Sequence, residues 1–283
     1  MRMKRFLKSI LLFSIFLLAF FAAQLLISLI VGLIVGFMGG DLYSDEVFML
    51  TYFLAMGGAY FATTLIERLA FKQVRPIAVS LRGFDPVAIL LGVVLLVALS
   101  VVLLPLNGVL PADGREFPDG PYTLISVVVL APILEELIFR GRLYNLFGRS
   151  VSPLFAVSLS AIAFGVVHFH PIVVIEAILS GFIFSYFYLY KRSIIIPIIL
   201  HVLNNAMAYT LLVLSYQGES LRQIIGNQEL VLPVYIVSVV IVVVGAIVIF
   251  RYLVKLGRQA NVDVHSEPLS TEQYNSEPID DSL

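Results

Sequence analysis

Long apolar stretches alternate with short polar ones along the whole chain. A helix that crosses a bilayer needs about 20 mostly apolar residues, and eight stretches approach or exceed that length. These stretches cover residues 10–38, 47–70, 86–110, 121–139, 153–169, 172–190, 194–215 and 231–254. Only His170-Pro171 separates the fifth stretch from the sixth, so the pattern leaves that boundary open. We predict an all-α fold, a polytopic transmembrane helical bundle of about eight spans.

The composition supports a membrane location. Hydrophobic residues make up 60% of the chain and charged residues 13%, whereas soluble domains hold about 45–50% and about 25%. The net charge of -1 excludes a strongly basic nucleic-acid-binding protein, so we expect no nucleic acid partner. Cysteine is absent, which excludes disulfides and thiolate metal sites. Any metal would therefore need His, Asp or Glu ligands.

Lys and Arg residues gather in every second loop. The N-terminus, the second, fourth and sixth loops and the flank after the last stretch are basic, and the fourth loop holds Arg140, Arg142 and Arg149. The other loops contain only Arg115 and Arg222, beside several acidic residues. Because cytoplasmic loops carry the excess of Lys and Arg, we predict that both termini are cytoplasmic. We expect an integral multi-pass protein of a bacterial plasma membrane.

Two adjacent carboxylates, Glu135 and Glu136, follow the fourth apolar stretch. Positions four apart share one face of a helix, so Glu136 can pair with Arg140. Glu135 then points elsewhere and has no cation near it in the sequence. A carboxylate beside an apolar segment is a candidate proton acceptor. The alternative is that both glutamates cap a basic helix end.

A second polar group lies at the end of the fifth stretch. Phe164 and His168 are four apart and share a helix face. One interpretation gives His168 a chemical role, and the other is a packed imidazole bonded to a backbone carbonyl. His170 precedes Pro171 at an expected turn, and we interpret it as an interfacial residue with no chemical role.

A third group lies in the seventh stretch, where His201 and Asn205 are four apart. An imidazole and a carboxamide on one face can donate hydrogen bonds to a developing oxyanion. The alternative is ordinary hydrogen bonding between spans, which His and Asn commonly provide. A base, an imidazole and an amide–imidazole pair are together what water attack on an amide requires.

The depths of these groups conflict if the fourth stretch ends at residue 139. At 1.5 Å per residue, Glu135 would lie about 8 Å from the boundary at Arg140, and His168 about 24 Å from that boundary. We therefore expect a tilted helix, a dip of residues 141–150 into the membrane, or a re-entrant segment that begins near His168.

The three motifs Glu-Glu-x-x-x-Arg, Phe-x-x-x-His and His-x-x-x-Asn occur in this order. Together they resemble the CAAX-protease and bacteriocin-processing family of intramembrane endopeptidases, which includes type II CAAX prenyl endopeptidases. The resemblance covers roughly residues 121–208. It implies that Glu135 is the general base, that His168 helps to hold the water, and that His201 and Asn205 stabilise the oxyanion. Glu136, Arg140 and Phe164 would support the site.

Members of this family have been described both as metalloproteases and as metal-free, glutamate-dependent enzymes. If a zinc ion is present, Glu135, His168 and His201 are its candidate ligands, with Glu176 as a further ligand or a partner for His168. The zincin motif His-Glu-x-x-His is absent. We assign no metal and favour metal-independent chemistry.

These observations predict an enzyme that hydrolyses a peptide bond of a membrane-associated peptide or protein. The substrate could be a lipidated protein or a bacteriocin-like precursor. A proton-coupled transporter is an alternative, because intramembrane Glu and His also build proton relays, and a non-catalytic immunity or scaffold protein is another. We divide the chain into N-terminal transmembrane helices (1–120), a CAAX-protease-like core (121–215), a last transmembrane helix (216–256) and a disordered acidic cytoplasmic tail (257–283), in which His265 is a solvated residue.

Overall fold

The computed structural model describes residues 2–109, 118, 120–213 and 221–263. Within these ranges the secondary structure is helical and contains no strand. The α-helices are α1 (Arg2–Phe37), α2 (Asp45–Phe71), α3 (Pro86–Leu103), α4 (Pro121–Ile125), α5 (Ala131–Glu136), α6 (Tyr144–Gly148), α7 (Pro153–Val166), α8 (Pro171–Lys191), α9 (Ile195–Val213), α10 (Leu221–Ile225) and α11 (Gln228–Asp263). Two 3₁₀ segments, η1 (Leu81–Gly83) and η2 (Leu104–Gly108), and two π-helical segments, η3 (Ser126–Leu130) and η4 (Leu137–Leu143), complete the order.

Six helical segments are long and apolar enough to cross a membrane, and α7 and α9 are shorter apolar helices. Each of the eight predicted stretches corresponds to one of these segments. Many large apolar side chains on α1, α3 and α11 are exposed, as expected for helices that face lipid rather than water. The predicted all-α polytopic bundle is therefore confirmed.

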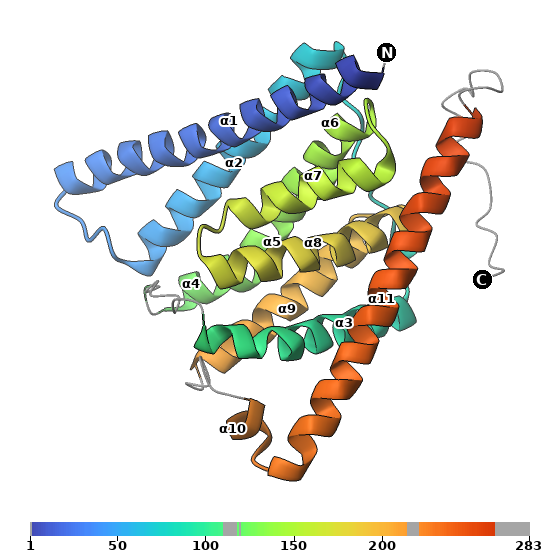
Figure 1. The fold of residues 1–283 in the computed structure, drawn as a ribbon. Helices are drawn as coiled ribbons and strands as arrows, with labels where there is room; N and C mark the ends of the chain where they lie inside the picture. Colours follow the sequence, from blue (N-terminus) through green and yellow to red (C-terminus); the bar gives the residue numbers. More distant parts are fainter. Residues whose placement is uncertain (1, 110–117, 119, 214–220, 264–283) are drawn as a thin grey trace.

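The helices form a layered bundle (Figure 1). α1 and α2 make an antiparallel hairpin along one side, and α11 runs obliquely along the opposite side against α3. α5, α7, α8 and α9 lie between these two walls. The residues of the three polar motifs lie on these central helices or directly next to them.

Local chemistry explains where several helices begin. Asp85 accepts hydrogen bonds from the backbone N–H groups of Val87 (2.9 Å) and Ala88 (3.1 Å), and Pro86 occupies the first turn of α3. Ser152 caps α7 in the same way ahead of its own proline, Pro153. Such side-chain caps satisfy N–H groups that have no partner inside the helix. Polar residues followed by proline therefore mark the helix starts in the sequence.

The fourth apolar stretch does not end at residue 139, so that predicted boundary is wrong. The helix continues from Pro121 to Gly148 through α4, η3, α5, η4 and α6. Arg140 is fully buried in it and is not a loop residue. Glu135 then lies about 20 Å from the Gly148 end, and His168 lies about 22 Å along the returning segment from Pro153. The expected conflict of depth disappears because both residues lie similarly far from the α6–α7 turn.

Glu67 joins the end of α2 to the end of the Pro121–Gly148 helix. Its side chain is fully buried and lies 2.8 Å from Arg149 Nη2 and 3.6 Å from Arg142 Nη1. The backbone N–H of Arg75 also donates to Glu67 (3.0 Å). Two basic residues that the sequence pattern assigned to a loop are thus partners of a buried acid.

The C-terminal helix is longer than predicted. α11 continues to Asp263, so residues 257–263 of the expected tail are helical. The rest of that tail, with His265, lies outside the described residues.

Gly165 allows α7 and α8 to approach closely. A Cβ atom at this position would overlap with Ile178 Cγ1 and lie 2.7 Å from the backbone oxygen of Val174. Small residues commonly permit such contact between membrane helices. Because one of these neighbours is backbone, a side chain at Gly165 would push the two helices apart.

We expect Gly165→Ala to lower the free energy of unfolding by about 1–3 kcal/mol, the usual cost of overpacking. Thermal unfolding of the purified protein in detergent measures this change. Gly57→Ala is the matched control, because a Cβ at Gly57 meets no atom within 4 Å. Equal stability of the two variants would contradict the close-packing argument.

Candidate active site

A buried ion pair lies at the centre of the site. Glu136 Oε1 is 2.7 Å from Arg140 Nη1, and both side chains are 0% exposed. The pairing predicted from their four-residue spacing is therefore observed. The Arg140 guanidinium also lies over the rings of Phe164 (4.4 Å) and Phe184 (5.2 Å). A buried charge needs this combination of an opposite charge and good contacts to be tolerated.

Arg140 also connects the helix to α8. Its Nη2 donates to the backbone oxygen of Gly181 (3.3 Å). A Cβ at Gly181 would lie 3.2 Å from that same nitrogen, so glycine leaves the guanidinium room to reach the backbone. The Phe-x-x-x-His motif joins this arrangement through Phe164, whose ring the guanidinium contacts.

His201 lies between the two glutamates. Its Nδ1 is 3.0 Å from Glu136 Oε1, and its Nε2 is 3.7 Å from Glu135 Oε2. A carboxylate oxygen can only accept, so Nδ1 carries the proton and donates it to Glu136. The ring stacks on Phe184 (4.8 Å between centroids). These contacts hold Nε2 toward Glu135 at a separation longer than a direct hydrogen bond.

Glu135 has a partner that lies far away in the sequence. The hydroxyl of Tyr52, on α2, donates to Glu135 Oε1 at 2.7 Å. Glu135 is 13% exposed, so it is less enclosed than Glu136. Tyr52 could not be predicted from the sequence, since it belongs to no motif and nothing in the chain distinguishes it from the other tyrosines.

His168 lies in the turn after α7. Its Nδ1 donates to the backbone oxygen of Phe164 at 2.7 Å, because a carbonyl oxygen can only accept. The Phe164 ring contacts both imidazoles edge-on, with centroids 5.1 Å from His168 and 5.5 Å from His201. One aromatic side chain therefore brings the second and third motifs together.

The side chain of Asn205 binds the backbone carbonyl of Val127, which lacks a hydrogen-bond donor within the π-helical segment η3. The amide nitrogen of Asn205 donates to Val127 O at 2.9 Å. In the π-helical segment the Ala131 N–H bonds to Ser126 O, and the next residue, Pro132, has no N–H to offer. Val127 O is thus left for Asn205. This contact places α9 against the helix that carries Glu135.

Two further residues singled out in the sequence are Glu176 and His170. Glu176 accepts a hydrogen bond from Ser100 on α3 at 3.3 Å. Both ring nitrogens of His170 are buried without a hydrogen-bond partner.

The candidate zinc ligands do not form a metal-binding group in the described part of the chain. Among the residues that the structure describes, no three His, Asp or Glu side chains lie close enough together to hold an ion. The nitrogens of His201 face Glu136 and Glu135, and Nδ1 of His168 is bonded to backbone. We therefore derive no chemical step through a metal.

Comparisons with known proteins place these residues in a family segment. Residues 118–207 match the model of the Rce1-like type II CAAX prenyl endopeptidases. The resemblance is confirmed over this segment. All three motifs lie inside it, whereas Tyr52 lies outside.

Two curated relatives also match. The chain is 28% identical over 109 residues to the "Putative membrane peptidase YdiL" of Bacillus subtilis, which covers 38% of this chain and 43% of the relative. It is 31% identical over 91 residues to the "Membrane-embedded CAAX protease MroQ" of Staphylococcus aureus, which covers 30% and 37%. The matches thus span about two fifths of these relatives. No solved structure matches significantly.

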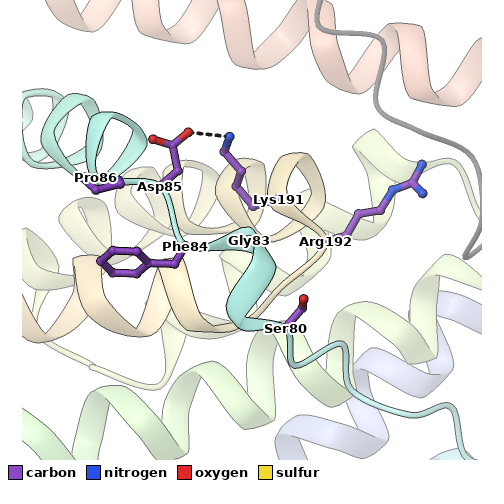
Figure 2. A pocket seen from close by; sticks show the side chains of 7 residues that line it. All are labelled: Ser80, Gly83, Phe84, Asp85, Pro86, Lys191 and Arg192. Atoms are coloured by element: carbon purple, nitrogen blue, oxygen red, sulfur yellow. Dashed lines mark hydrogen bonds and ion pairs between the residues drawn. The ribbon is translucent and has the colours of Figure 1, made fainter.

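A pocket of about 390 Å³ lies away from the CAAX-protease-like residues, where α8 ends and α3 begins. Figure 2 shows Lys191 reaching across to Asp85, while Arg192 points to the other side. Lys191 Nζ lies 2.7 Å from Asp85 Oδ2, and this hydrogen bond lowers the pKa of Asp85. An apolar groove of about 660 Å³ between α3, α8 and α11 shares both residues. Neither hollow is lined by the motif residues.

Breaking the buried pair on one side should destabilise the protein strongly. We expect Arg140→Gln to lower the free energy of unfolding by about 3–5 kcal/mol, because it leaves the Glu136 carboxylate buried without its cation. The double variant Glu136→Gln/Arg140→Gln should recover part of this loss, since no charge remains uncompensated. Detergent-phase unfolding of both variants measures the difference. A double variant as unstable as Arg140→Gln would contradict the argument.

The Asp85–Lys191 pair should stabilise the protein only above acidic pH. Because the pKa of Asp85 is lowered in the folded protein, its stabilising effect is complete above the ordinary aspartate pKa. The effect is lost as pH falls through the lowered value. Asp85→Asn keeps a helix-capping residue but removes the charge. We expect the melting temperatures of wild type and variant to converge on acidification. A constant difference down to pH 2 would contradict this prediction.

Proposed function

We propose that this protein is an intramembrane endopeptidase that hydrolyses a peptide bond with a water activated by Glu135. One observation carries the proposal. Glu135 Oε2 and His201 Nε2 face each other at 3.7 Å, a separation at which both atoms can contact one oxygen that lies to the side of the line joining them. The match of residues 118–207 to the CAAX endopeptidase model supports the same reaction class.

In this proposal Glu135 Oε2 binds the water on the side that faces His201, and His168 helps to hold it. Glu135 takes a proton from the water as its oxygen bonds to the carbonyl carbon of the substrate. The carbonyl oxygen becomes an oxyanion, stabilised by hydrogen bonds from His201 and from the carboxamide of Asn205. The carbon–nitrogen bond then breaks, and the leaving amine takes the proton from Glu135. Glu136 and Arg140 do not touch the substrate but hold His201 in place.

The substrate we propose is a peptide or protein segment that lies in or on the membrane. A lipidated tail and a bacteriocin-like precursor both fit this class. We propose a bacterial plasma membrane with both termini in the cytoplasm, from the alternation of basic loops. Phe164 contacts both His168 and His201, and His201 in turn approaches Glu135. This local grouping favours hydrolysis over a proton relay, which needs polar residues along the whole path.

Glu135→Gln should abolish cleavage while leaving the fold intact, because an amide keeps the shape of the side chain but cannot accept the proton. We expect kcat to fall about a hundredfold to ten-thousandfold. Peptide profiling of cells that carry wild type or variant would reveal the substrate as the species that accumulates. The purified protein in nanodiscs is then assayed on an internally quenched, membrane-anchored peptide of that sequence.

The matched control is Glu229→Gln, at an exposed position at the start of α11. It should cleave like wild type. His168→Ala should lose activity as Glu135→Gln does, and persistent wild-type turnover in either variant would remove the assigned role. A chelator should leave the activity unchanged, and loss of turnover that added zinc restores would replace the metal-free proposal.

A further inference from the structure

The hydroxyl of Tyr52 contacts the proposed general base from outside the matched family segment. Tyr52 lies on α2, and its hydroxyl donates to Glu135 Oε1 at 2.7 Å across a sequence separation of 83 residues. Nothing in the motifs of residues 118–207 requires this contact. A residue of the N-terminal hairpin is therefore a direct neighbour of the reacting group.

Because of this hydrogen bond, the two carboxylate oxygens of Glu135 have different partners. Oε1 accepts from Tyr52, and Oε2 faces His201 Nε2. A carboxylate with both oxygens free could turn about its terminal bonds, which have broad rotational wells. A phenol that donates to a carboxylate makes a charge-assisted bond, which is shorter and stronger than a neutral one. The bond thus keeps Oε2 toward the imidazole.

The Tyr52 ring is itself restrained. Phe48, one turn earlier on α2, stacks against it with 6.3 Å between centroids and 29° between planes. α2 also packs against η3, α5 and η4, so the hydroxyl arrives from a helix that lies against the one it contacts. Pre-organised contacts of this kind are what hold a base in its productive position.

We propose that Tyr52 is a positioning residue that holds the Glu135 carboxylate with one oxygen directed at the reacting water. The inference rests on the proposed peptidase function and extends the active site to the N-terminal hairpin. Tyr52 acts through Glu135 and gives up no proton during the reaction. Its loss should therefore slow the chemical step and leave substrate binding unchanged.

The test is Tyr52→Phe, assayed in nanodiscs on the quenched, membrane-anchored peptide introduced above. We expect kcat to fall about tenfold to a hundredfold, the range for loss of a hydrogen bond to a charged group, with KM within about twofold of wild type. Tyr60→Phe is the matched control. It removes a hydroxyl from the same helix, one that accepts from Arg142 at 2.8 Å, and should lower stability without lowering kcat.

A second measurement does not depend on the folding of Tyr52→Phe. Replacing Tyr52 with 3-fluorotyrosine keeps the ring and hydroxyl but changes the donor strength. The acidic limb of the kcat–pH profile should be displaced from that of wild type, and the same replacement at Tyr60 should not displace it. Unchanged profiles at both positions, or wild-type kcat in Tyr52→Phe, would overturn the proposal.

The two proposals fail in different ways. If the wild-type protein does not cleave, or if Glu135→Gln cleaves like wild type, the peptidase function itself is wrong. If wild type cleaves, Glu135→Gln does not, and Tyr52→Phe retains full kcat, only the role of Tyr52 is wrong.

Discussion

The ion pair of Glu136 and Arg140 is the interaction on which the site depends. Neither side chain reaches water, so each charge is tolerable only because the other is there. Each member of the pair also contacts another helix. Glu136 accepts a hydrogen bond from His201 on α9, and Arg140 donates one to the backbone oxygen of Gly181 on α8. The rings of Phe164 and Phe184 cover the guanidinium. One pair of charges thus sets the relation of four helices.

The two adjacent glutamates differ in how deeply they are buried. Glu136 is fully buried and its Oε1 accepts from both Arg140 and His201, whereas Glu135 is partly exposed and keeps an oxygen that faces His201 across 3.7 Å. Two adjacent residues of the same type therefore have different environments. The more enclosed one suits a structural role, and the more open one suits chemistry on a bound water.

Local periodicity predicted part of this arrangement. The Glu136–Arg140 pair and the Phe164–His168 contact each join residues that are four apart in the sequence. Such residues are neighbours on one helix, so the sequence alone predicts these contacts. The end of the fourth span could not be predicted in this way. Arg140 and Arg142 were assigned to a loop because charge usually marks a boundary. Arg142, however, pairs with Glu67, a residue of another helix that no local pattern reveals.

The other features that the sequence did not predict are contacts between segments far apart in the chain. Tyr52 meets Glu135 only because α2 packs on the motif-bearing helix, and its own surroundings in the sequence contain no sign of this. The contact of Asn205 with Val127 had a local signal, since Pro132 deprives a carbonyl of its donor. That signal marks an unsatisfied oxygen but not the residue that satisfies it.

Glu67 fastens one end of α2 to the helix that carries Glu135. At one end, two arginines and a backbone N–H hold Glu67 of α2 against the turn after Gly148. Nearer the middle, a single phenol joins α2 to Glu135. At the other end of α2, Asp45 accepts a hydrogen bond from the backbone N–H of Tyr122 at 3.0 Å. Because α2 is fastened at both ends, its rotation about its own axis is restrained, and the Tyr52 hydroxyl between the two fastenings stays beside Glu135.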